Sequence, residues 1–462
     1  MRKWWPLVAV CLGTFLFLLD TTVLSVVLPG TGEELDASLS ALQWVANIYT
    51  LVLAVLMLTM GALVDRLGAR TVYVVGLAVF GIASLVCGLA PDAGVLIAAR
   101  GVQGIGGAAM AVTTFALIGS VYRGPDMGRA MGIFGAVTGL AAAVGPMLGG
   151  VLTQYLSWRA VFFLNLPLVA VTVALSLRVL AAGRPGTGRR IDLPGMAAFA
   201  ACAGSLTYAL TLAADEGWTS PAALGLLTLA TLSLVVFTRI ELRSGAPLLD
   251  VRLFSRASFS GVMMCVAAST AAFAALVYTS VWLQSGLGLG PVRAGLALMP
   301  LALASFATSL ISGRRLHGRS PRAILATGLL LSGIGCALQA GLDADSSAGS
   351  LAAGLALTGI GVGLMGPAMG AAVFAALPPE RGGMAAGAMT TFRQLGQTLG
   401  VAAFGLLFQH HGGAMSEGGL NRVLIAAAAT GIIGSALACA FVPKPAAAKA
   451  TGTRPRNLTG SR

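Results

Sequence analysis

The chain has 462 residues, of which 57% are hydrophobic and 10% are charged, and its mean hydropathy is +0.88. A composition this apolar excludes a soluble globular protein of this size and indicates a protein that crosses a membrane many times. The net charge of +13 would suit a nucleic-acid partner, but its distribution along the chain indicates another role.

Fourteen apolar segments follow one another along the sequence, most of them 19 to 27 residues long. A helix of that length crosses a bilayer with some tilt, so we predict an all-α membrane protein with fourteen transmembrane helices. The first segment is too long for a signal peptide, and we expect it to be retained. The segments are 5–28, 41–63, 71–90, 94–118, 130–154, 160–181, 193–213, 221–239, 258–284, 292–313, 322–341, 349–375, 384–408 and 420–442.

The charge of the loops alternates along this series. With the N-terminus inside, cytoplasmic segments hold 24 of the 29 lysines and arginines, external loops hold three, and helices hold two. External loops carry acidic residues instead. This positive-inside pattern predicts a multi-pass protein of the plasma membrane with both termini cytoplasmic. The basic charge then orients the chain against anionic lipid, and no nucleic-acid partner is expected.

Two polar stretches divide the helices into groups of six, two and six. A shift of 255 residues aligns the outer groups, pairing Gly104 with Gly359 and Gly145 with Gly400, as in the repeated halves of secondary transporters. We therefore predict four parts: an N-terminal six-helix bundle at 1–182, a linker with two inserted helices at 183–245, a C-terminal six-helix bundle at 246–443, and a cytoplasmic tail at 444–462.

Asp20 is the only acidic residue inside the predicted spans. A carboxylate at this depth costs about 2.5 to 3.5 kcal/mol on insertion scales, so it marks an ion or substrate path or pairs with a neighbouring helix. Arg100 in the fourth segment shares its depth, because both residues lie roughly 9–12 Å below the outer surface at 1.5 Å per residue. Burial and a nearby cation act on a carboxyl pKa in opposite directions, which suits a proton carrier. A static structural pair is the alternative.

The turn after the second segment reads GALVDRLGART, residues 61–71. Its charges can pair with each other or with a nearby helix N-terminus and so hold the inner faces of the two halves together. An ordinary basic loop is the alternative. The residues assigned to this conformational gate are Gly61, Asp65, Arg66, Gly68 and Arg70.

The fifth segment contains GLAAAVGPMLGGVL. Pro146 removes a helix hydrogen bond and favours a kink, while the glycines are expected to make one smooth face. Such a helix suits sliding of the two halves, and close packing without motion is the alternative. The four glycines are Gly139, Gly145, Gly149 and Gly150.

Polar side chains elsewhere in the spans are candidates for a substrate cavity or for bonds between helices. Arg393 enters its helix from the inner side and could face the cavity, although a gate or the lipid interface suits it better. The uncharged candidates are Asn47, Gln103, Asn165 and Gln284. The six cysteines form no close motif, the adjacent His410 and His411 have no third ligand nearby in sequence, and no phosphate-binding loop occurs. We therefore expect no metal, cofactor or catalytic residue.

Taken together, these motifs resemble those of the 14-helix drug:proton antiporter branch of the major facilitator superfamily. GALVDRLGART resembles the superfamily's signature after helix two, LIAARGVQGIGGAA its helix-four signature, and GLAAAVGPMLGG the helix-five signature of antiporters. LDTTVLSVVLP, residues 19–29, resembles the branch's helix-one signature and places its acid at Asp20. The resemblance spans nearly the whole chain and includes WRAVFFLNLP (158–167), PLLDVRLF (247–254) and TTFRQLGQTLG (390–400).

The resemblance implies a fold of two six-helix bundles that works by alternating access. A proton from outside would neutralise Asp20 while a lipophilic substrate leaves outward, and the empty carrier would release the proton inside. Arg100 would tune the Asp20 carboxyl group and the hydrogen bonds around it. The expected partners are a small lipophilic substrate, protons and the bilayer. The expected energy source is the proton gradient. We expect the carrier to be a monomer without enzymatic activity.

Three alternatives remain open from the sequence. The same fold could move a specific non-drug solute such as a lipid, siderophore, amino acid or sugar. A membrane enzyme would need a catalytic cluster at the membrane face, and the sequence offers none. A sensor or scaffold could use the carrier fold without flux.

Overall fold

The computed structural model of the chain describes residues 2–123, 125–182, 192–245, 247–315, 319–343, 345–375, 382–409 and 417–442. All regular structure within these ranges is helical. In lipid every backbone polar group needs an internal partner, and a helix supplies it within one segment. The predicted tail at 444–462 and most of the polar stretch before residue 192 lie outside the described residues.

The first half of the chain forms six long helices after a short 3₁₀ turn, η1 (Arg2–Trp4). These helices are α1 (Trp5–Leu35), α2 (Leu39–Leu67), α3 (Ala69–Gly88), α4 (Ala93–Val121), α5 (Pro125–Tyr155) and α6 (Arg159–Val179). The helices α7 (Leu193–Glu216) and α8 (Pro221–Arg243) come next and pack together as a pair.

The second half begins with a 3₁₀ turn, η2 (Val251–Ser255), and its first membrane-length segment is broken into three pieces. They are α9 (Ala257–Phe273), α10 (Ala275–Val281) and a π-helical turn, η3 (Trp282–Gly286). The remaining elements are α11 (Pro291–Arg315), α12 (Pro321–Gln339), the 3₁₀ turn η4 (Ala348–Leu351), α13 (Ala352–Ala375), α14 (Gly382–Gln409) and α15 (Glu417–Phe441).

Local sequence signals explain where several helices start. Proline is the first residue of α5, α8, α11 and α12, where its missing N–H leaves no hydrogen bond unmade. The side chains of Ser38, Asp92 and Asp192 accept hydrogen bonds from backbone N–H groups three residues later and so cap α2, α4 and α7. Gly68 joins α2 to α3 with a φ of +86°, a conformation that glycine adopts at little cost.

Each of the fourteen predicted apolar segments coincides with helix in the structure, the ninth as α9, α10 and η3 together. Twelve of the described segments are long and apolar enough to cross a membrane. The helices outside this set are α5 and α14, with 31 and 28 residues. The structure therefore supports a polytopic membrane fold, and the exact number of spans stays a prediction.

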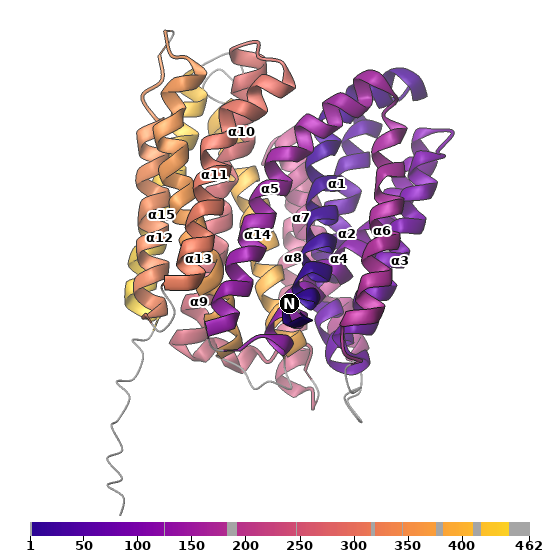
Figure 1. The fold of residues 1–462 in the computed structure, drawn as a ribbon, viewed down its shortest axis with the longest axis vertical. Coiled ribbons are helices and arrows are strands. Elements are labelled where there is room, and N and C mark those ends of the chain that lie inside the picture. The colour runs from indigo at the N-terminus through magenta and orange to yellow at the C-terminus, as the bar shows by residue number, and fades with distance from the viewer. Residues whose placement is uncertain are drawn as a thin grey trace, which may run out of the picture.

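The two outer groups of helices repeat one packing scheme. α3 packs on α4 and α6, and in the same way α12 packs on α13 and α15. The pairs α2–α4 and α1–α5 correspond to α11–α13 and α9–α14. Figure 1 shows α1–α4 and α6 on one side of the molecule and α9–α13 and α15 on the other. This arrangement accords with the repeat in the sequence, and the exact domain boundaries stay predictions.

Four helices lie along the seam between these groups. α5 packs on α11, and α2 packs on α14. The inserted helix α7 contacts both α2 and α14, and the rings of Trp44 and Tyr208 lie 5.4 Å apart where it meets α2. α7 therefore bridges the seam, whereas α8 exposes many apolar side chains, among them Leu224, Leu229, Leu232, Val235 and Val236.

Candidate functional site: a buried ion pair, a central cavity and a closed seam

The two charged residues predicted at one depth do meet. Nη1 of Arg100 on α4 lies 2.6 Å from Oδ2 of Asp20 on α1, and both side chains are 1% exposed. The backbone supports this contact, because α1 packs directly on α4. A buried ion pair must be geometrically good to offset the loss of hydration, and these charges have further partners.

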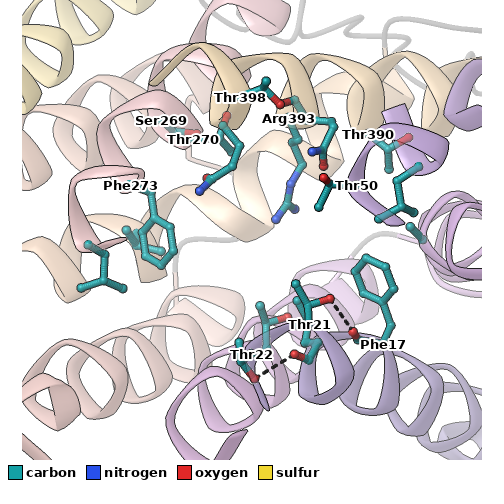
Figure 2. A pocket seen from close by; sticks show the side chains of 18 of the residues that line it. Phe17, Thr21, Thr22, Thr50, Ser269, Thr270, Phe273, Thr390, Arg393 and Thr398 are labelled. Atoms are coloured by element: carbon teal, nitrogen blue, oxygen red, sulfur yellow. Dashed lines mark hydrogen bonds between the residues drawn. The ribbon is translucent and has the colours of Figure 1, made fainter. Parts of the chain in front are cut away.

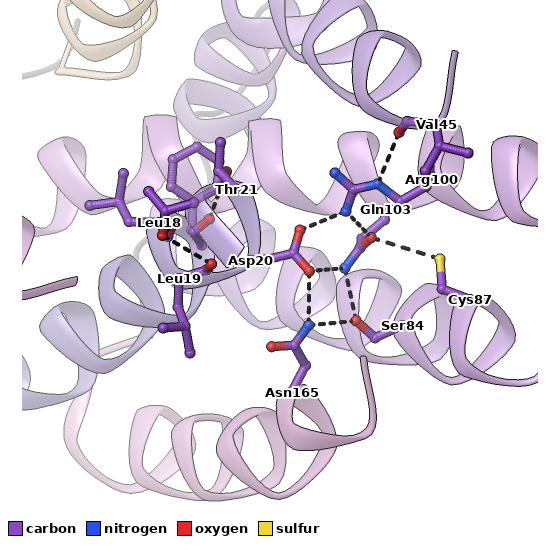
Figure 3. A network of polar contacts seen from close by, with 12 residues as sticks. Leu18, Leu19, Asp20, Thr21, Val45, Ser84, Cys87, Arg100, Gln103 and Asn165 are labelled. Atoms are coloured by element: carbon purple, nitrogen blue, oxygen red, sulfur yellow. Dashed lines mark hydrogen bonds and ion pairs between the residues drawn. The ribbon is translucent and has the colours of Figure 1, made fainter. Parts of the chain in front are cut away.

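Three more polar side chains complete what we call the Asp20 cluster: Asp20, Ser84, Arg100, Gln103 and Asn165. The side-chain amides of Gln103 and Asn165 each donate to Oδ1 of Asp20 over 2.9 Å. The same two amides donate to the hydroxyl of Ser84 on α3, over 2.8 and 2.9 Å. Figure 3 shows these side chains converging on the carboxylate from α1, α3, α4 and α6.

Arg100 has partners besides Asp20. Its Nη1 donates to Oε1 of Gln103 over 2.6 Å, and its Nε donates to the carbonyl oxygen of Val45 over 3.3 Å. Its Cζ lies 4.3 Å from the centre of the Tyr49 ring, which is cation–π geometry. The guanidinium therefore keeps three contacts if the ion pair breaks.

A cavity of about 950 Å³ lies between the two halves. It is lined by α1, α2, α4 and α5 from one side and by α9, α10, α11, α13 and α14 from the other, with α7 contributing Thr207, Leu210 and Thr211. Figure 2 shows the lining, with threonine and phenylalanine side chains on both faces. This volume and mixed lining suit an amphipathic small molecule.

Asp20 is not part of the cavity lining, although its neighbours Leu18, Thr21 and Thr22 are. One face of α1 therefore contacts the cavity, and another face carries the carboxylate into the Asp20 cluster. Movement of α1 would act on both regions at once.

The end of the bundle that contains the α2–α3 turn is closed across the seam. Both carboxylate oxygens of Asp65 accept backbone N–H groups at the start of α14, from Gly383 over 2.7 Å and from Met384 over 3.0 Å. The first amides of a helix have no partner within it and favour an anion. A Cβ atom at Gly61 would lie 2.6 Å from the carbonyl oxygen of Gly383, so α2 and α14 are in backbone contact here.

The other residues of the predicted gate lie in different environments. Arg70 donates to the carbonyl oxygen of Leu177 near the end of α6, over 2.7 Å. Arg66 is exposed and has no hydrogen bond or ion pair to the part of the chain that the structure describes. Of the five predicted gate residues, Asp65 and Gly61 contact α14 of the other half within the described part of the chain, while Gly68 shapes the turn.

The glycines of α5 face two neighbours and do not form the single smooth face predicted from the sequence. A Cβ at Gly145 or Gly149 would meet Thr22 or Val23 of α1, whereas one at Gly139 would meet the carbonyl of Ala302 on α11. Six residues separate Gly139 from Gly145, which turns the helix by about 240° at 3.6 residues per turn. The helix runs on through Pro146, and Gly150 is half-buried.

Two of the five residues predicted to line the cavity do so. Asn47 and Arg393 line it. Gln103 and Asn165 belong instead to the Asp20 cluster, and Gln284 is exposed on η3, where it bonds to Ser280 of the adjoining α10. Gln103 follows Arg100 by three residues on one helix face, a spacing that could have placed it correctly.

Sequence reasoning missed several residues of these sites. Ser84 joins the two amides of the Asp20 cluster, and no local pattern marks it. Gln394 and Gln397 line the cavity beside Arg393, within the TTFRQLGQTLG stretch. Two glutamines close to an arginine in one predicted helix could have indicated a cavity lining.

Comparisons with known proteins agree with this architecture. Residues 10–319 and 306–459 match the Major Facilitator Superfamily. The chain is 36% identical over 411 residues to the puromycin resistance protein of Streptomyces alboniger, covering 87% of this chain and 81% of that protein. It is 33% identical over 401 residues to the multidrug resistance protein Stp of Mycobacterium tuberculosis, covering 86% of this chain and 74% of that protein.

Solved structures share the fold at low sequence identity. The human organic anion transporter MFSD10 superposes with a TM-score of 0.71 at 17% identity, covering 94% of this chain and 99% of that one. The proton:xylose symporter XylE superposes with a TM-score of 0.69 at 14% identity, covering 96% of each chain. This chain is a multi-pass membrane transporter of the plasma membrane and belongs to the major facilitator superfamily.

Proposed function

We propose that this protein is a proton-coupled antiporter that exports amphipathic or aromatic small molecules by alternating access. The relatives named for puromycin resistance and multidrug resistance support a drug or antibiotic as cargo. The observation that carries proton coupling is the Asp20–Arg100 pair, buried one helix face away from the cavity. We further propose fourteen spans, with α5 and α14 among them, both termini cytoplasmic, and a monomeric carrier.

In this proposal the coupling element is α1. Protonation of Asp20 removes the ionised acceptor of Arg100, which keeps Gln103, the Val45 carbonyl and the Tyr49 ring as partners. The cost of breaking the pair is thereby reduced, because no buried cation is left without contacts. α1 is then held less firmly to α4 and α6, and its cavity face, at Thr21 and Thr22, can shift.

The conformation fits one stage of such a cycle. The cavity lining reaches Gln43 near the start of α2 and Phe408 near the end of α14. At the opposite end, Asp65 and Gly61 close the seam against α14. With the basic turns on the cytoplasmic side, the closed end is inner, and this is an outward-facing form ready to release cargo or accept a proton.

The test is transport by purified protein in proteoliposomes with an imposed pH gradient, using antibiotics and aromatic dyes, puromycin among them. We expect gradient-driven flux that collapses with a protonophore and falls more than about tenfold in Asp20→Asn. The matched control is Asp126→Asn, which removes a carboxylate paired with Lys3 near the surface.

Two other results of this transport experiment would contradict different parts of the proposed function. Flux that is indifferent to the gradient, or unchanged in Asp20→Asn, contradicts proton coupling through this residue. Absence of flux for every antibiotic and dye, with gradient-driven uptake of a sugar, amino acid or siderophore, contradicts drug export and leaves a specialised carrier.

A further inference from the structure

The described part of the cavity lining carries positive charge and no negative charge. Among the described residues that line it, Arg393 is the only charged one, and aspartate, glutamate and lysine are absent. The other polar lining groups are neutral hydroxyls and amides. α14 itself contributes no other charged residue, so nothing on its own helix offsets Arg393.

Arg393 also lacks a counter-ion within the described part of the chain. It has no hydrogen bond or ion pair there, and its Cζ lies 5.6 Å from the centre of the Phe115 ring on α4. In Figure 2 its side chain extends from α14 toward the face of the cavity that carries Thr21. The buried arginine of the other half, Arg100, by contrast has an ion pair with Asp20 and a hydrogen bond to the Val45 carbonyl.

Asp20, the acidic residue of the predicted spans, is committed to other partners. Asp20 is held by Arg100 and by two amides inside the first half, and it does not line the cavity. A cation in a half-buried, largely apolar cavity interacts more strongly with an anion than it would in water, because the local dielectric is low. A planar guanidinium moreover matches a carboxylate by forming two parallel hydrogen bonds.

We propose that the cavity selects monoanionic aromatic compounds, whose carboxylate or equivalent group pairs with Arg393 while the ring system contacts Phe17 and Phe273. This deepens the proposed function by naming a substrate class, and as a statement about transport it rests on that function. An interior-negative membrane potential drives an anion outward, so export of such a compound gains from the potential as well as from the proton gradient.

The test uses one scaffold in three charge states: anthracene-2-carboxylate, its methyl ester, and the corresponding anthracenylmethylammonium. Binding to the full-length protein in nanodiscs is measured by fluorescence anisotropy without any ion gradient, with empty nanodiscs as the blank. We expect the carboxylate to bind at least about tenfold more tightly than the ester and the ammonium compound to bind most weakly.

Variants then assign the preference to one residue. Arg393→Gln should weaken carboxylate binding at least about tenfold and leave the ester unchanged, and Arg393→Glu should make the ammonium compound the best ligand. The matched control is Arg422→Gln, which removes an exposed arginine of α15 outside the lining and should change nothing.

Wild-type protein that binds the three compounds equally, or prefers the ammonium compound, overturns the proposal, and this result needs no variant to fold. A carboxylate preference that persists in Arg393→Gln also overturns it. Because these measurements use no gradient, they stand apart from the proposed function: loss of transport in Asp20→Asn with carboxylate selectivity intact separates coupling from recognition.

Discussion

Oδ1 of Asp65 lies 2.7 Å from the backbone nitrogen of Gly383, a residue 318 positions later in the chain. One carboxylate at the end of α2 thereby caps α14 of the opposite half. The contact joins the α2–α3 turn of the first half to a seam helix that also carries Arg393. It is specific to this conformation, because separating α2 from α14 at this end must break it.

Asp65→Asn is expected to open this end of the seam. The amide keeps one acceptor oxygen and loses the charge that favours a helix N-terminus, which weakens closure by about 1–3 kcal/mol. The population should shift accordingly toward the form open at this end. Distances between spin labels at Leu67→Cys and Arg319→Cys, both exposed at this end, report the change.

The control for that experiment is Asp126→Asn, whose parent carboxylate pairs with Lys3 in the same half. Its distance distribution should equal that of the wild type. Equal distributions for Asp65→Asn and wild type would mean that the cap contributes little to closure. Cys439, the exposed cysteine among the six, is replaced by serine to avoid stray labelling.

Gly61→Ala tests the backbone contact beside the cap. The added Cβ would lie 2.6 Å from the carbonyl oxygen of Gly383, and backbone there cannot rotate away as a side chain could. The closed form is therefore expected to be lost, and the same spin-label pair should report separation. Gly225→Ala on α8 is the control, since a Cβ there has open space. Normal closure in Gly61→Ala would show that the seam tolerates a wider spacing.

Ser84→Ala is expected to destabilise the first half. The hydroxyl accepts one N–H each from Gln103 and Asn165, and its removal leaves two buried donors unsatisfied at about 1–3 kcal/mol each. Thermal unfolding in detergent should show a lower Tm. Ser205→Ala is the comparison, because Ser205 bonds only to carbonyls of its own helix. Equal Tm values would show that the amides find other partners.

Phe273→Ala is expected to weaken binding of aromatic ligands. Loss of one aromatic contact costs about 0.5–1.5 kcal/mol, or roughly two- to thirteenfold in Kd. The neutral anthracene ester isolates this effect from the charge of Arg393, and anisotropy gives the Kd. Phe306→Ala on α11 serves as the control, because that ring is 42% exposed and lies outside the lining. An unchanged Kd would place the ligand elsewhere in the cavity.

The sequence by itself determined the features that depend on one helix or on depth in the bilayer. Apolar length predicted the fourteen helical segments, and loop charge predicted an orientation that remains to be tested. Equal depth on two antiparallel segments predicted that Asp20 and Arg100 could meet, as they do. These inferences succeed because hydrophobic length, helical rise and the cost of a buried charge are local properties.

Only the tertiary structure decided which helices meet and which way each is rotated. It placed Asn165 and Ser84 with Asp20, turned Gly139 and Gly145 toward different neighbours, and directed Arg393 into the cavity instead of toward a gate or lipid. Because the chain is so apolar, nearly every face of a helix can be buried. Hydrophobic periodicity therefore does not fix the rotation of each helix about its own axis. Close packing of small residues far apart in the sequence fixes it, as at Gly61 and Gly383.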